Sequence, residues 1–128
     1  MLTDPLVQAF ETASVDPKAF RHREHLYVAW CYWSELSLEE ALYRYVSKLR
    51  QLGNALGAAD KFHATITWAY MVLLSEAMEK SPDMSFDELL TANPQLLDHK
   101  SGALAQYYDP KQLASDEARR RFVLPARA

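Results

Sequence analysis

The placement of its prolines constrains the fold of this chain more than any other feature. The 128 residues contain six prolines and only three glycines, and five of the prolines stand where helices would begin or end. Proline is tolerated in the first turn of a helix but breaks the interior, so these positions act as boundaries. The pattern therefore predicts one helix after another along the chain.

The residues between the prolines support this prediction. Apolar side chains recur at steps of three and four residues, and Ser37–Glu40 and Ser85–Glu88 have the form of capping boxes. Helices are predicted over about 5–13, 17–35, 38–52, 61–80 with Asp60 as its cap, and 86–92, followed by short helices over 94–98, 102–108 and 115–123. No segment alternates polar and apolar residues as a strand would. We expect an all-α fold, a compact single-domain bundle of about six or seven helices spanning residues 1–128.

Composition and charge restrict the classes of function. The net charge of −3 gives no overall attraction to nucleic acid or to anionic lipid, so neither is an expected partner. The longest apolar stretches, 26–33 and 68–74, are too short to cross a bilayer, and the first residues lack the pattern of a secretory signal. The single cysteine, Cys31, cannot form an intrachain disulfide. We therefore expect a cytoplasmic protein, whose aromatic-rich helices could support a homodimer.

Three of the four histidines fall in two clusters, each at the start of an apolar helical stretch. His22 and His25 are one turn apart on a predicted helix, so their rings can converge, and His63 on another helix could complete a set of three. Three histidines with one open position are typical of catalytic zinc sites. The pattern predicts a site for a divalent transition metal such as zinc, held by His22, His25 and His63. The fourth histidine, His99, lies in a turn-like segment and is predicted at the surface.

Three further residues carry the ligand-binding part of this hypothesis. Thr67 follows His63 by four residues and could orient a metal-bound water or a substrate. Arg21, which precedes His25 by four residues, and Arg119 could neutralise the charge of a bound ligand. The leading interpretation is a small metal-binding protein, and its catalytic form would be a metal-dependent enzyme acting on a small polar or anionic substrate.

Two alternatives stay open at this level. The same side chains could line a pocket for a small ligand without a metal, or the histidines could be capping or core-edge residues bonded to backbone carbonyls. The alternative function is a noncatalytic helical module for protein interaction or small-ligand binding, which needs no cofactor. An H-x-x-H pair lacks the glutamate and the spacing of the H-E-x-x-H zinc motif, so the motif does not decide between these readings.

Four segments, 20–26, 62–69, 92–97 and 118–125, resemble a family of small bacterial proteins known only as hypothetical proteins. The family motifs are an H-x-x-H-L segment and an aromatic-His-Glu-Thr-x-Thr segment, and this chain is similar to both. The resemblance runs nearly end to end and implies a helical fold but no established activity. Ala64 stands where the family commonly has glutamate, which puts any role of that carboxylate in doubt here. The family pattern implies roles for His22, His25, His63, Thr65, Thr67, Tyr107, Tyr108 and Arg119.

Overall fold

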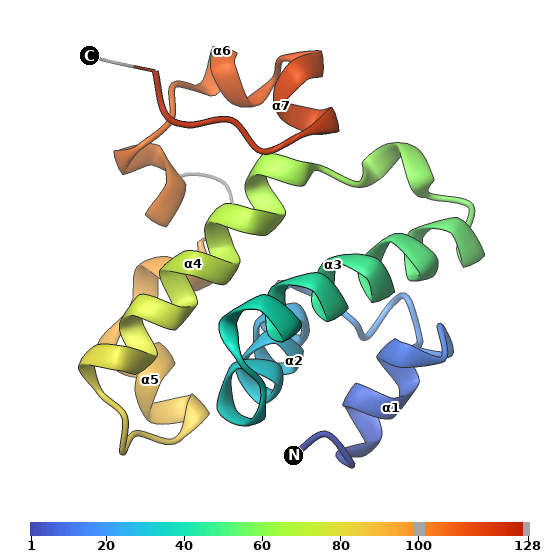
Figure 1. The fold of residues 1–128 in the computed structure, drawn as a ribbon, viewed down its shortest axis with the longest axis vertical. Helices are drawn as coiled ribbons and strands as arrows, with labels where there is room; N and C mark the ends of the chain where they lie inside the picture. The colour runs from blue at the N-terminus through green and yellow to red at the C-terminus, as the bar shows by residue number, and fades with distance from the viewer. Residues whose placement is uncertain (99–101, 127–128) are drawn as a thin grey trace. The chain divides into compact units, whose positions relative to one another are not determined.

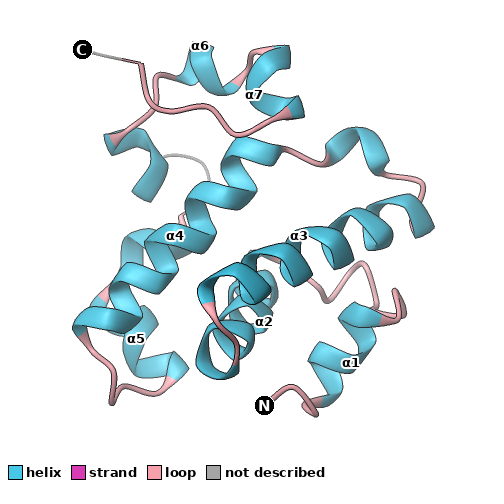
Figure 2. Ribbon diagram, in the orientation of Figure 1, coloured by secondary structure: helices cyan, strands magenta, loops and turns pink. Residues whose placement is uncertain are grey.

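A computed structural model describes residues 1–98 and 102–126 of the chain (Figure 1). Within these residues the ordered elements are helices and no strand is present (Figure 2), which confirms the predicted all-α fold class. No helix in the described ranges is both long and apolar enough to span a membrane. His99, predicted at the surface, lies outside them. The described α-helices are α1 (Pro5–Glu11), α2 (His22–Glu35), α3 (Leu38–Ala55), α4 (Ala64–Lys80), α5 (Phe86–Ala92), α6 (Pro110–Leu113) and α7 (Asp116–Arg120), and the 3₁₀ helices are η1 (Ala59–Lys61), η2 (Pro94–Leu97) and η3 (Ala103–Gln106).

The helices fall into two compact units, Met1–Phe62 and His63–Ala128. In the first unit, α1, α2 and α3 each contact the other two, and η1 contacts α3. In the second unit, α4 contacts η3 and α7, α6 contacts α7, and α5 contacts η2. The predicted histidine clusters therefore belong to different units. That residues 1–128 form a single domain stays a prediction.

Phe10 lies in the middle of an aromatic cluster in the first unit. Its ring centroid is 5.7 Å from that of Phe20 and 5.4 Å from that of Tyr45, both in stacked geometry, and 6.3 Å from that of Tyr32. All four rings are buried. Aromatic pairs in such arrangements stabilise a core beyond the burial of their area, so this cluster joins α1, α2 and α3.

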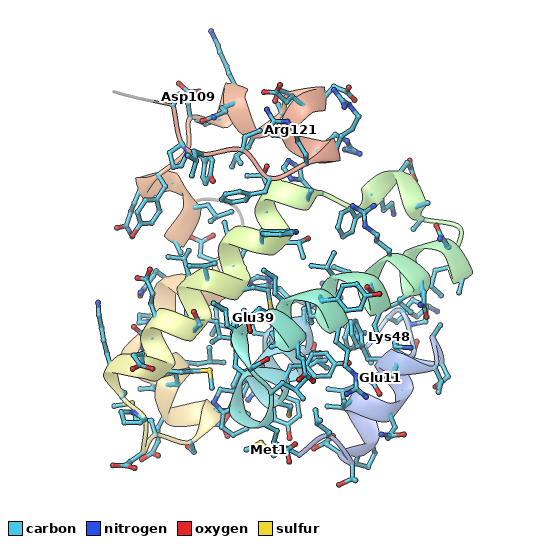
Figure 3. All side chains as sticks on the ribbon, viewed as in Figure 1. Met1, Glu11, Glu39, Lys48, Asp109 and Arg121 are labelled. Carbon is cyan, nitrogen blue, oxygen red and sulfur yellow. The ribbon has the colours of Figure 1, made fainter. Side chains whose placement is uncertain are left out.

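A largely buried carboxylate ties the same three helices together. Glu11, whose side chain is 12% exposed, accepts hydrogen bonds from the Tyr32 hydroxyl at 2.5 Å and from Arg44 Nε at 2.7 Å. A second guanidinium nitrogen of Arg44 donates to its other oxygen at 3.1 Å. Glu11 is labelled on α1 in Figure 3. Since a buried charge is costly unless it is paired, these bonds make the carboxylate compatible with the core.

The second predicted helix begins later than expected, and this part of the prediction is wrong. Asp16 forms a turn, and its carbonyl accepts the N–H of Phe20 at 2.9 Å. The chain then becomes extended at Arg21, and α2 starts at the next residue. Two interactions account for the break: Phe20 is held against Phe10, and Glu24 accepts the N–H of Arg21 at 2.9 Å.

The third predicted helix is confirmed and runs slightly further than expected. The Ser37 hydroxyl accepts the N–H of Glu40 at 3.3 Å at its start. Gly53 lies inside α3, whereas Gly57 follows the helix with a φ of +68°. A left-handed glycine just beyond the last turn is the usual C-terminal stop, because it has no Cβ to clash.

For the helices of the second unit, one capping prediction is confirmed, another is wrong, and one predicted helix is shorter than expected. Ser85 and Glu88 form both bonds of a capping box at the start of α5, at 2.9 and 3.2 Å. Asp60 is not the cap of α4, because it lies in η1 and His63 occupies that position. The helix predicted over 115–123 is shorter, since α7 ends at Arg120 and the next residues are extended.

Candidate functional site

His63 uses both of its ring nitrogens for hydrogen bonds within the second unit. As the N-cap of α4, its Nδ1 accepts the backbone N–H of Ile66 at 3.1 Å. Its Nε2 lies 2.6 Å from the carbonyl oxygen of Leu113 in α6. A carbonyl can only accept, so Nε2 carries the proton and the ring is the neutral Nε2–H tautomer. His63 thus starts α4 and links it to α6.

Thr65 and Thr67 belong to the same segment, 62–69, as His63, and their side chains also bond to the backbone. The buried hydroxyl of Thr65 donates to the carbonyl of Arg121 at 2.9 Å and accepts the N–H of Val123 at 3.1 Å. The hydroxyl of Thr67 donates to the carbonyl of His63 at 2.7 Å, one turn back on its own helix. Thr67, predicted to orient water or substrate, is therefore occupied by a local bond in this structure.

The extended residues after α7 are fastened at several further points. Tyr108 donates from its hydroxyl to the carbonyl of Val123 at 2.6 Å. Gln112 donates to the carbonyl of Leu124 at 2.8 Å and accepts the N–H of Ala126 at 3.0 Å. Figure 3 labels Arg121, the residue at which this segment leaves α7. The second histidine motif and the C-terminal segment thus form one hydrogen-bonded network.

His22 and His25 lie in the first turn of α2, in the first unit. The His25 ring packs edge-on against Phe20, with centroids 4.4 Å apart, and its Nδ1 is 3.3 Å from the Tyr45 hydroxyl. Burial, followed by the nearby His22, lowers the pKa of His25 to about 4, although Glu24 acts in the opposite direction. His25 is therefore uncharged at neutral pH and belongs to the aromatic cluster around Phe10.

The three histidines predicted to bind a metal are thus divided between the units. A metal ion could bind to His63 only if one of the two hydrogen bonds of its ring nitrogens were broken, because neither nitrogen has a free lone pair directed elsewhere. Among residues 1–98 and 102–126, no three side chains of histidine, cysteine, aspartate or glutamate are grouped in a way that could hold a metal ion. The predicted ligand-binding arginines are exposed, Arg21 before α2 and Arg119 on α7.

The second unit also contains a cavity of about 320 Å³ that the sequence did not indicate. It lies among α4, η3 and α6, and two of its walls are Ile66 and Leu113, the residues that His63 bridges. Gly102 forms part of the wall, where a Cβ would come within 2.4 Å of two carbonyl oxygens and therefore would not fit. Among the residues that the structure describes, the lining consists of Ile66, Tyr70, Gly102, Leu104, Ala105, Tyr108, Pro110, Leu113 and Ala114.

The hydroxyls of the two tyrosines in the lining donate to backbone carbonyls. Tyr70 donates to the carbonyl of Asp98 at 3.2 Å, and Tyr108 to that of Val123 at 2.6 Å. Burial, and to a lesser extent the charge of Asp98, raises the pKa of Tyr70 to about 12. Burial also raises the pKa of Tyr108. Both phenols therefore stay neutral, and every described residue of the lining is uncharged at physiological pH.

The residue pattern of the sequence does not indicate this cavity. Tyr108 was named through the family resemblance. The other lining residues lie on α4 and on or beside the short helices η3 and α6, whose pairing with α4 depends on contacts distant in sequence. Comparison with known proteins adds no assignment: no protein-family model matches the chain, and no match was found to a curated protein or to a solved structure.

Proposed function

We propose that this chain is a noncatalytic helical module that binds a small ligand in its second unit, and that its histidines serve structure. The observation that carries the proposal is the cavity of about 320 Å³ with its apolar and tyrosine lining. Small-molecule sites in proteins are concave, mostly apolar, and enclose roughly 300–1,000 Å³. The cavity reaches the lower end of this range, which suits a ligand of modest size.

The two hydrogen bonds of the His63 ring support a structural role for the segment 62–69. A metal ion at Nδ1 would remove the acceptor of the Ile66 N–H, and one at Nε2 would remove the donor to the Leu113 carbonyl. Leaving such a partly buried group unpaired costs about 1–3 kcal/mol. The cavity walls would also lose the residue that connects them. These costs oppose metal binding at His63.

Metal analysis separates this proposal from the zinc hypothesis. Protein purified without a histidine tag or a chelator is compared with a His63→Ala variant by elemental analysis. Equal and negligible metal content in both supports structural histidines. One bound transition-metal ion per wild-type chain that is lost from the variant supports the three-histidine site formed by His22, His25 and His63, and contradicts the proposal.

A neutral fluorescent probe tests ligand binding directly. N-phenyl-1-naphthylamine, whose emission rises in apolar surroundings, is titrated into the wild-type chain and into Ala105→Leu. Ala105 lines the cavity and is exposed, so leucine there should narrow the cavity without disturbing the buried core. We expect saturable binding to the wild type and a loss of at least about tenfold in affinity for the variant, equivalent to about 1.4 kcal/mol.

The matched control is Ala92→Leu, the same substitution at an exposed position of α5 outside the cavity lining. Its affinity for the probe should equal that of the wild type. Absence of saturable binding to the wild type, or equal affinity of all three proteins, would contradict the proposed function.

A cytoplasmic location is consistent with this proposal. Cys31 is a free thiol with no exposed surface, and burial raises its pKa. A thiol of this kind behaves as a small core residue rather than as a nucleophile.

A further inference from the structure

We infer that the second unit has a binding site for an extended peptide from a partner protein, and that residues 121–126 of the chain itself occupy this site in the structure. We call the site the peptide-binding face, and the side chains that form it are those of Thr65, Trp68, Tyr108 and Gln112. It is distinct from the cavity, although Tyr108 belongs to both. The inference goes beyond the proposed small-ligand function and does not depend on it.

The first part of the bound segment is held through its main chain by two hydroxyl groups. Thr65 donates to the carbonyl of Arg121 at 2.9 Å and accepts the N–H of Val123 at 3.1 Å. Tyr108 donates to the carbonyl of Val123 at 2.6 Å. The N–H and the carbonyl of Val123 are thus both bonded to side chains of the peptide-binding face.

The side-chain amide of Gln112 binds the second part of the segment in the same way. It donates to the carbonyl of Leu124 at 2.8 Å and accepts the N–H of Ala126 at 3.0 Å. Like Thr65, it bridges a carbonyl and the N–H two residues further on. Almost any sequence presents these groups, and main-chain hydrogen bonds also supply the affinity where a protein binds an extended peptide at a sheet edge. A peptide from another protein can therefore make the same bonds.

Two side chains of the segment define the sequence that the face selects. Phe122 stacks on Trp68, with ring centroids 5.7 Å apart and an angle of 25° between the ring planes. Val123 is buried, with 8% of its surface exposed, whereas Leu124 is 76% exposed. The ligand that fits this face is an extended peptide in which an aromatic residue is followed directly by an aliphatic residue of the size of valine.

The way in which the segment is attached allows it to be replaced. Among residues 121–126, Val123 is buried, Phe122 is half-buried and the other four are exposed. Release therefore exposes little apolar area, and each hydrogen bond contributes modestly because the same groups bond to water when they are free. The tethered segment competes with an effective concentration on the order of millimolar. Weakening its Val123 contact should thus open the face to lower concentrations of an external peptide.

A peptide with the sequence of residues 121–126, acetylated and amidated, tests the inference. It is titrated into the isotope-labelled chain, where the NMR signal of the Ala126 amide reports whether the chain's own segment is bound to Gln112. The proteins are the wild type, Val123→Ala, which weakens a buried contact, and the matched control Leu124→Ala, which shortens an exposed side chain. In a control peptide, aspartate replaces the valine.

We expect the peptide to release the segment, so that the Ala126 amide shifts in a saturable manner to the position of an unbonded amide. Half release in Val123→Ala should need a peptide concentration at least about tenfold lower than in the wild type, whereas Leu124→Ala should behave like the wild type. The aspartate peptide should release the segment from none of these proteins, because it would bury a charge. If Val123→Ala loses its helical circular dichroism, Val123→Thr takes its place.

Three results would overturn the inference. The first is no release in any of the proteins at peptide concentrations on the order of 10 mM, since the segment would then be a fixed part of the second unit. The second is equal release by both peptides, or equal responses of Val123→Ala and Leu124→Ala, because the face would not select the aromatic–aliphatic pair. The third is a wild-type dimer in light scattering that the peptide converts to monomers, which would assign the face to the same segment of a second copy.

Discussion

At the scale of single residues, the roles of the histidines follow from what each ring nitrogen bonds to. His63 is fixed as a neutral tautomer by one donor and one acceptor. His25 is packed against Phe20 and close to the Tyr45 hydroxyl, where a charged ring would be poorly solvated. The environment of His25 favours an uncharged imidazole, and this makes the fold sensitive to acid.

The free energy of unfolding should therefore decrease as the pH is lowered, because of His25. Its pKa is about 4 in the fold against 6.5 for the free side chain, so between these values the unfolded chain binds more protons. The contribution of His25 is fully present above pH 6.5 and is lost as the pH decreases toward 4. We expect a loss of about 2 kcal/mol in the free energy of unfolding between about pH 7.5 and pH 5, measured by urea denaturation.

The His25→Gln variant is the control for this prediction. Glutamine can still bond to the Tyr45 hydroxyl but does not titrate in this range. The variant should lose about 2 kcal/mol less than the wild type over the same pH interval. Parallel pH dependence of the two proteins would show that His25 is not the responsible group.

At the scale of the elements, the start of α4 and the segment after α7 depend on each other. Thr65 satisfies two backbone groups of that segment, the carbonyl of Arg121 and the N–H of Val123, at a position without exposed surface. Thr67, two residues further on, bonds only to a carbonyl of its own helix. The two threonines thus provide a matched pair in one motif.

Thr65→Val should be far more destabilising than Thr67→Val. Valine keeps the shape but removes the hydroxyl, which at position 65 leaves a buried donor and an acceptor unpaired and costs about 2–3 kcal/mol. At position 67 the carbonyl of His63 keeps the N–H of residue 67 as a partner, so we expect a change within about 0.5 kcal/mol. Urea denaturation measures both values, and hydrogen exchange at the Val123 amide should accelerate only in Thr65→Val. Equal effects of the two substitutions would refute this account of the motif.

The elements also show how far local sequence determines this structure. The cap at Ser37 and the capping box at Ser85 were predicted because the residues that form them are neighbours in sequence. The late start of α2 and the early end of α7 were not, because they depend in part on contacts with Phe10 and Thr65, which lie further away in sequence. The same holds for the candidate site: its motifs were found, whereas the partners of their side chains and the cavity were not.

At the scale of the whole molecule, the division into two units bears on how the chain unfolds. Each unit has about 60 residues, a size at which a separate core is only marginally stable. The sequence predicts a single domain, and we expect the two units to unfold in one cooperative transition.

The tryptophans allow this prediction to be tested unit by unit. Trp30 and Trp33 lie in the first unit, and Trp68, which stacks on Phe122 at 5.7 Å, lies in the second. Fluorescence of Trp68→Phe reports on the first unit, and that of the double variant Trp30→Phe with Trp33→Phe reports on the second. For each variant the fluorescence midpoint in urea should coincide with that of its helical circular dichroism. Separate midpoints would mean that the units unfold independently.

The bond between Thr65 and Val123 has a consequence for biosynthesis. The two residues are 58 positions apart, and a ribosome adds roughly 5–20 residues per second. The partner of Thr65 is therefore made roughly 3 to 12 seconds after the threonine itself. Throughout this interval the nascent helix presents a polar group destined for the interior, and the second unit completes its packing only late in translation.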